Sequence, residues 1–185
     1  MSLDTTTLGA LGKQPKDVNF LSGIKFKFQI RKLPNVVYFC QEANIPSVTL
    51  AISQTPTPMG INLKHGGNKL TYGDLNLTFM IDEDMQNYIE LYNWIKGLGH
   101  PRSLDEYAAM KSGDPTAITQ FGGLFSDAVL TVLDSDSNAN LNIFYVNVFP
   151  FALQEVSLRS TSDDTDYKTC TASFVYEDFS IRPVV

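Results

Sequence analysis

The sequence predicts a mainly β fold, an antiparallel sandwich or barrel with one flanking α-helix and a long hairpin arm. Several short runs alternate apolar and polar residues, the period-two spacing of strands that bury one face. Turn-forming residues separate these runs at short intervals. Only Glu83–Lys96 shows a long apolar stripe at helical spacing. Many short strands with one helix favour this architecture.

The length and composition indicate one folded unit. A chain of 185 residues with 43% hydrophobic content can build a single core. We expect a flexible N-terminal arm over residues 1–20 and one β domain over residues 21–185, with an insert at 99–126. The net charge of -6 is uneven, because Met1–Lys69 carries 8 Lys and Arg against 3 Asp and Glu, whereas the remainder carries 6 against 17. This division could average separate solvated surfaces, but it also suits head-to-tail pairing of copies.

The first predicted strand, Ile24–Arg31, has an apolar face and a basic face. After a turn at Pro34, Val36–Glu42 is expected to return as the second strand of a hairpin. Val48–Ile52 then starts the long hairpin arm. Its tip is expected near Gly66 and Gly67, from where the chain returns through Leu70 and Tyr72.

A strand over Leu75–Ile81 is followed directly by the helix Glu83–Lys96. Asp82 is the expected N-cap, and burial of Trp94 or Tyr92 is expected to pin the helix to the sheet. The insert contains a short helical candidate, Leu104–Lys111. The later strands are expected over Ala128–Leu133, Leu141–Phe149, Ala152–Leu158 and Lys168–Ile181, with polar turns at Asp134–Asn140 and Ser160–Asp166.

Sites of chemistry are scarce. His65 and His100 are the only histidines, too few for a multi-histidine metal site, and we find no phosphate loop, nucleophile elbow or paired-cysteine motif. Cys40 and Cys170 lie in strand-like runs with no signal peptide before them, so we expect reduced, buried thiols. We expect no enzyme, no cofactor, no metal and no membrane span. One alternative function remains, a monomeric sandwich that binds a small ligand or carbohydrate through Tyr72, Tyr92 or Trp94.

Three stretches in order carry a resemblance to a known family. They are FCQEANIP at Phe39–Pro46, LNLTFMIDEDMQNYIELYNWI at Leu75–Ile95, and the run from Phe149-Pro150 to the closing pattern at Thr171–Phe179. This order resembles the tail tube proteins of contractile-tailed bacteriophages, including the related baseplate proteins at which their tubes start.

The resemblance implies a tail-tube-like β-sandwich and a structural virion protein. Its homohexameric rings would stack into the inner tail tube of the phage, assembled in the host cytoplasm, through which DNA passes without specific binding. The implied partners are copies of itself and sheath and baseplate proteins, with no membrane. The long insert and N-terminal arm keep a tube-initiating baseplate ring as an alternative.

Two sets of surface residues follow from these expectations. DNA must slide through the lumen without binding to its wall, so we expect neutral polar strand faces to line the lumen. A basic strand face is expected in an interface between subunits instead. We expect the interface between subunits to include Lys25, Lys27, Arg31, Lys64 and His65. We expect the lumen to be faced by Asn76, Thr78, Thr169, Thr171 and Ser173.

Overall fold

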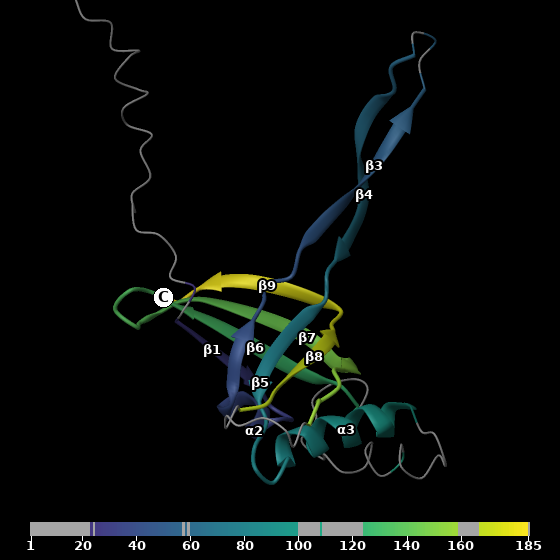
Figure 1. Ribbon diagram of the computed structural model, residues 1–185. Coiled ribbons are helices and arrows are strands. Elements are labelled where there is room, and N and C mark those ends of the chain that lie inside the picture. The colour runs from purple at the N-terminus through teal and green to yellow at the C-terminus, as the bar shows by residue number, and fades with distance from the viewer. Residues whose placement is uncertain are drawn as a thin grey trace, which may run out of the picture.

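The fold is mainly β and antiparallel, as predicted, with a two-stranded arm that leaves the body (Figure 1). The computed structural model describes Gly23, residues 25–56, Pro58, residues 60–99, Ala108, and residues 124–158 and 167–184. The predicted N-terminal arm, most of the 99–126 insert with all of its helical candidate except Ala108, and the turn at Ser160–Asp166 lie outside these residues. The helices are α2 (Pro34–Tyr38) and α3 (Gln86–Gly99). The strands are β1 (Phe26–Ile30), β2 (Cys40–Ala43), β3 (Val48–Thr55), β4 (Leu63–Tyr72), β5 (Leu75–Met80), β6 (Ser126–Leu133), β7 (Ala139–Leu153), β8 (Thr169–Val175) and β9 (Asp178–Pro183).

The strands of the body are connected by hydrogen bonds into one continuous sheet. Strand β7 is shared by two parts of it, which we call sheet A and sheet B. The first part of β7 pairs with β6 and β9, and with β1 beyond β6 this set forms sheet A. The last part of β7 pairs with β8, which continues to β5 and β2 to form sheet B. Because β7 belongs to both sheets, a bend in this strand turns the chain from one layer into the other.

Asn147 makes that bend. Its φ is +55°, in the left-handed region, and its backbone N–H donates to Asp127 Oδ1 at 3.3 Å. Its side-chain amide donates to Glu177 Oε2, and Glu177 lies in the bend between β8 and β9. Asparagine tolerates this backbone conformation better than most residues with a Cβ. The side chain therefore ties together the two strands that change sheets.

We predict that Asn147→Ala lowers the free energy of unfolding by about 1–2 kcal/mol, because alanine is strained at this φ and cannot replace the side-chain bond. Asn147→Gly is the matched control, since glycine relieves the strain and loses only the bond. Denaturant midpoints measure both. Equal losses in the two variants would show that the strain at this position is negligible.

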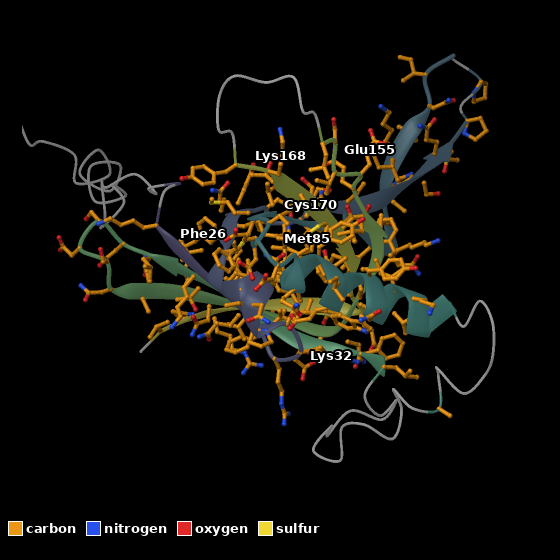
Figure 2. All side chains as sticks on the ribbon, turned by 60° about the horizontal axis from the view of Figure 1, so that its bottom comes forward. Phe26, Lys32, Met85, Glu155, Lys168 and Cys170 are labelled. Carbon is orange, nitrogen blue, oxygen red and sulfur yellow. The ribbon has the colours of Figure 1, made fainter. Side chains whose placement is uncertain are left out.

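The core fills the space between the inner faces of the two sheets. Sheet A contributes Phe28, Leu130 and Ile143, and sheet B contributes Leu77, Phe79 and Phe174, all buried. These residues lie at the alternating positions that the period-two patterns predict. The free thiol of Cys170 is also buried, among side chains at the centre of the body (Figure 2), whereas the free thiol of Cys40 is half-buried. Burial raises the pKa of Cys40 to about 11, so its thiol is protonated at neutral pH.

Helix α3 is present but begins at Gln86, so the prediction that Asp82 is its N-cap was wrong. Met85 has a φ of +53°, which breaks the helical conformation, and its N–H donates to the Asp82 carbonyl in a separate turn. Asn87, fully buried, supports this turn instead. Its amide donates to the Met80 carbonyl at 2.7 Å, and its oxygen accepts from the Tyr88 N–H at 2.8 Å. Trp94 is buried, as the sequence predicts.

The predicted N-terminal hairpin was also wrong. The run Val36–Glu42 is not one strand, because Pro34 opens the short helix α2 and only Cys40–Ala43 is extended. β1 pairs with β6 and β2 pairs with β5, so neither strand pairs with the other. These partners are distant in the chain, and local alternation carries no information about them.

Three later boundaries differ from prediction as well. The separate strand expected over Ala152–Leu158 is absent among the described residues, because β7 continues to Leu153 and residues 154–158 are irregular. The single run expected over Lys168–Ile181 is divided into β8 and β9 at the bend. Gly66 and Gly67 lie within β4 and not at the tip of the arm. A Cβ at Gly67 would lie 2.5 Å from the Ala51 carbonyl oxygen, which explains this glycine by close strand approach.

Candidate assembly surfaces

The arm formed by β3 and β4 is the feature least suited to an isolated chain. Among the residues that the structure describes, its two strands pair only with each other, and they stand away from the body in Figure 1 and Figure 2. A two-stranded hairpin without further cover is marginally stable in water. Its two outer edges also expose unpaired backbone groups. The geometry therefore favours an arm that packs on another chain.

One face of the arm is apolar. Val48 and Leu50 alternate along β3, so they point to the same side. The register shifts between Leu50 and Ile52, but a Cβ at Gly66, directly opposite Ile52, would lie 3.9 Å from Leu50 Cδ2, so Ile52 shares that side. Leu70 lies directly opposite Leu50, and directly opposite residues share a face. Leu50 is 47% exposed, Ile52 64% and Leu70 53%. Contiguous exposed apolar residues of this kind mark interaction surfaces. We call Val48, Leu50, Ile52 and Leu70 the apolar face of the arm.

The base of the arm is held by aromatic side chains. The Tyr72 ring lies 6.1 Å from that of Tyr176 and 5.3 Å from that of Phe179, between ring centroids. Tyr176 donates its hydroxyl to the Gly73 carbonyl at 2.9 Å. Burial raises the pKa of Tyr176 to about 12, so this donor keeps its proton at neutral pH. The hydrogen bond to Asp178 raises the pKa of Tyr72. These contacts fix the root of the arm to the bend between β8 and β9.

The predicted interface residues lie in two separate places. Lys64 and His65 are on β4 of the arm, opposite Gln54 and Ser53, and both are exposed. The residues Lys25, Lys27 and Arg31 lie along β1 and its flanks. Lys25 Nζ donates to the Ser135 carbonyl and to Ser137 Oγ, so it closes the β6–β7 turn of its own chain. Lys27 and Arg31 are exposed.

The predicted lumen residues lie together on one sheet face. Asn76 is opposite Ser173, Thr78 is opposite Thr171, and Thr169 is opposite Met80, all on the face of sheet B that points away from the core. Ser173 Oγ donates to Asn76 Oδ1 at 2.7 Å, and the hydroxyls of Thr78 and Thr171 are 3.3 Å apart. Glu42 lies opposite Thr78 on β2. This outer face of sheet B is therefore neutral and hydroxyl-rich, with one carboxylate at its side.

The aromatic residues considered for a ligand platform are not brought together. Trp94 is on the buried side of α3, Tyr72 lies at the root of the arm, and Tyr92 is on the exposed side of α3. Figure 1 places the arm and α3 at opposite ends of the body. In the part of the chain that the structure describes, no three His, Cys, Asp or Glu side chains are grouped to hold a metal ion. Within the same ranges, no helix has the length and apolarity needed to cross a membrane.

The apolar face of the arm was missed by sequence reasoning. The alternation of Val48, Leu50 and Ile52 was visible and predicted a strand, but alternation usually indicates a face buried in the chain's own core. Alternation looks the same in both cases, and only the exposure of these side chains in the structure distinguishes them.

Comparisons with known proteins identify relatives of the whole chain. The family described as phage tail tube protein matches residues 11–182. The tail tube terminator protein of Enterobacteria phage T4 is 27% identical over 145 residues, which span 77% of this chain and 76% of that protein.

Solved structures show the same fold at low identity. The tube-terminating cap of the anti-feeding prophage has a TM-score of 0.62 and 12% identity, covering 94% of this chain and 97% of that one. A chain of the anti-feeding prophage baseplate gives 0.60 and 15%, covering 90% and 97%. A chain of the sheath–tube complex of an extracellular contractile injection system gives 0.57 and 12%, covering 99% and 100%.

Proposed function

The chain belongs to the phage tail tube protein family, a family of structural proteins and not of enzymes, and from this premise we propose that it forms homohexameric rings of a contractile phage tail tube. These rings stack, and phage DNA passes through them. The observation that carries the proposal is the apolar face of the arm, which is half exposed in the single chain and requires cover. Copies of the same chain supply this cover in a closed ring or stack.

The outer face of sheet B is proposed to line the lumen. Its side chains hydrogen-bond to each other across strands and carry no cation at the five positions Asn76, Thr78, Thr169, Thr171 and Ser173. DNA affinity depends on neutralising phosphates with Lys and Arg, so such a face lets DNA move. Lys64 and His65 are proposed to contact neighbouring copies through the arm.

We also propose that residues 21–185 form one domain, with an insert at 99–126. The rings work in the tail of the virion, after assembly in the host cytoplasm, and they contact sheath and baseplate proteins. The structural neighbours that are chains of a sheath–tube complex and of a baseplate support these partners by fold alone.

Negative-stain microscopy of the concentrated protein tests the proposal, with light scattering across a wide concentration range beside it. We expect sixfold rings, and stacked tubes if the chain is the repeated tube subunit. A monomer at every concentration would refute ring formation and would favour the ligand-binding module.

A tube-terminating ring is the second candidate, and the T4 terminator match favours it. In this role the chain is proposed to form rings that do not stack further and to stop the growth of tubes made from the tube protein of the same phage. Added in small amounts to growing tubes, a terminator shortens them, whereas a repeated tube subunit is incorporated. A ring from which new tubes start would identify the chain as an initiator of the baseplate.

We predict that the assembled protein does not bind DNA at physiological salt, and that Thr171→Lys creates salt-sensitive binding. Lysine at this position would place one cation per subunit on the proposed lumen face. Gel shifts with short double-stranded DNA over a salt series measure both. The control is Thr49→Lys, on the arm. Wild-type binding in the micromolar range that is lost in Lys27→Ala would overturn the neutral lumen and would indicate a nucleic-acid-binding protein.

A further inference from the structure

The pairing of the arm is irregular halfway along its length. From the root, β3 and β4 pair residue by residue as far as Leu50 and Leu70. The next pair toward the tip is Ile52 with Gly66. Between these two pairs β3 has one residue, whereas β4 has three, residues 67–69. Strand β4 therefore carries a bulge of two extra residues. A bulge bends its strand and increases the local twist, and Figure 1 shows the two strands of the arm twisted about each other.

Gly67 is the residue that lets this bulge form. A Cβ at this position would lie 2.5 Å from the Ala51 carbonyl oxygen and 3.2 Å from the Ala51 Cβ. The obstacle is the opposite backbone, which cannot turn aside as the end of a flexible side chain can. The neighbouring Gly66 is different, because a Cβ there would meet Leu50 Cδ2 at 3.9 Å, an ordinary contact distance. The bulge therefore excludes a side chain at position 67 and accepts one at position 66.

A second pairing of the arm is available without the bulge. If the spacing at the root continued to the tip, Ser53 would lie opposite Gly67 instead of His65, and residues 67–69 would all join the ladder. We call the observed pairing the bulged register and this alternative the straight register. Side chains alternate with a period of two, so a shift by two residues leaves each of them on the same face. The apolar face of the arm is therefore kept in both registers.

The two registers differ in what they demand of position 67. The bulged register requires that this residue has no Cβ. The straight register places it in an ordinary cross-strand pair, where a Cβ fits and where glycine contributes no side chain to pack. Glycine-containing strands with polar residues on both sides of a hairpin also specify their register weakly. A single side chain can therefore decide between the two pairings.

We propose that Gly67 determines the register of the arm, and that ring formation requires the bent arm that the bulged register produces. The part that concerns rings rests on the proposed function. The outer half of the arm carries Ile52, which is 64% exposed, and the exposed Lys64. The bend sets the direction in which these side chains leave the body and meet a neighbouring copy. In the straight register the same side chains point along a different line.

Pairs of cysteines report the register of the purified chain under mild oxidation. Ser53→Cys with His65→Cys joins residues that are directly opposite in the bulged register, whereas Thr55→Cys with His65→Cys does so in the straight register. Directly opposite Cα atoms are about 4.5–5.5 Å apart, within disulfide range, whereas diagonal neighbours are about 7–8 Å apart and outside it. We expect the first pair to form the disulfide in the wild-type and Gly66→Ala backgrounds, and the second pair to form it in the Gly67→Ala background.

The single variant His65→Cys controls for a bridge to the native thiol of Cys40. If Gly67→Ala keeps the disulfide between positions 53 and 65, this glycine does not determine the register. If Gly67→Ala forms neither disulfide, the straight register is not an alternative state of the arm. If the wild-type background forms both disulfides equally well, Gly67 does not select between the registers. Each of these three results would overturn the proposal.

Light scattering and negative-stain microscopy test the dependence of rings on the bend. Gly67→Ala should raise the concentration needed for rings at least about tenfold, and Gly66→Ala no more than about twofold. The denaturant midpoint should stay near that of the wild type in both, because in the described residues the arm pairs with no strand of the body. Rings of Gly67→Ala at wild-type concentrations, with its register switched, would show that the bend is not required. Failure of the wild-type chain to form rings would overturn the proposed function, while the cysteine pairs would still decide the role of Gly67 in the register.

Discussion

Trp94→Ala should lower the free energy of unfolding by about 3–5 kcal/mol, the cost of deleting a large aromatic side chain from a core. Trp94 is 3% exposed, and its ring lies 6.4 Å from that of Phe174 in strand β8. Its indole N–H donates to the Leu124 carbonyl at 2.9 Å, so the substitution also leaves that carbonyl without its partner. The ammonium of Lys32, 4.8 Å from the ring centroid, loses a cation–π contact.

Denaturant unfolding of the purified chain measures this loss, and Tyr92→Ala is the matched control. Tyr92 is on the same helix, two residues earlier, but is 52% exposed. We expect its removal to change stability by no more than about 0.5 kcal/mol, as for most surface substitutions. A Trp94→Ala midpoint near that of the wild type would contradict the role of this residue in fixing α3 to the sheets.

Local patterns predicted the features that local physics determines. The alternation in Leu75–Ile81 predicted β5 and its buried face, and helical spacing predicted α3 and the burial of Trp94. The five predicted lumen residues share a face for a related reason. Alternation assigns each of them to the polar side of its strand, and the antiparallel pairing of β5 with β8 then makes those sides continuous.

The wrong predictions concern features that depend on partners distant in the sequence or on the backbone conformation of a single residue. The return strand expected after β1 does not exist, because β1 finds its partner about a hundred residues later, in β6. The bend at Asn147 lies inside an apolar run that alternates well on both sides. A single residue with positive φ is invisible to periodicity, yet it converts one sheet into two layers. The turn at Met85 displaced the start of α3 for the same reason.

The apolar face of the arm should control assembly without controlling folding. We predict that Leu50→Asp with Leu70→Asp weakens ring or tube formation about ten- to a hundredfold, since burying the exposed half of two leucines is worth about 1.5–3 kcal/mol and each 1.4 kcal/mol is tenfold. The denaturant midpoint of the monomer should stay near that of the wild type, because both side chains are about half exposed in the single chain. Light scattering and negative-stain microscopy measure assembly.

The arm supplies its own control for this experiment. Thr49 and Thr71 form the neighbouring cross-strand pair, directly beside Leu50 and Leu70 but on the opposite face of the same two strands. Thr49→Asp with Thr71→Asp therefore adds the same charge to the same part of the arm and leaves its apolar face intact. If the leucine variant still assembles at wild-type concentrations, the apolar face is not covered by other copies. If the threonine variant fails equally, added charge and not the loss of apolar contact prevents assembly, and the arm must be buried on both faces.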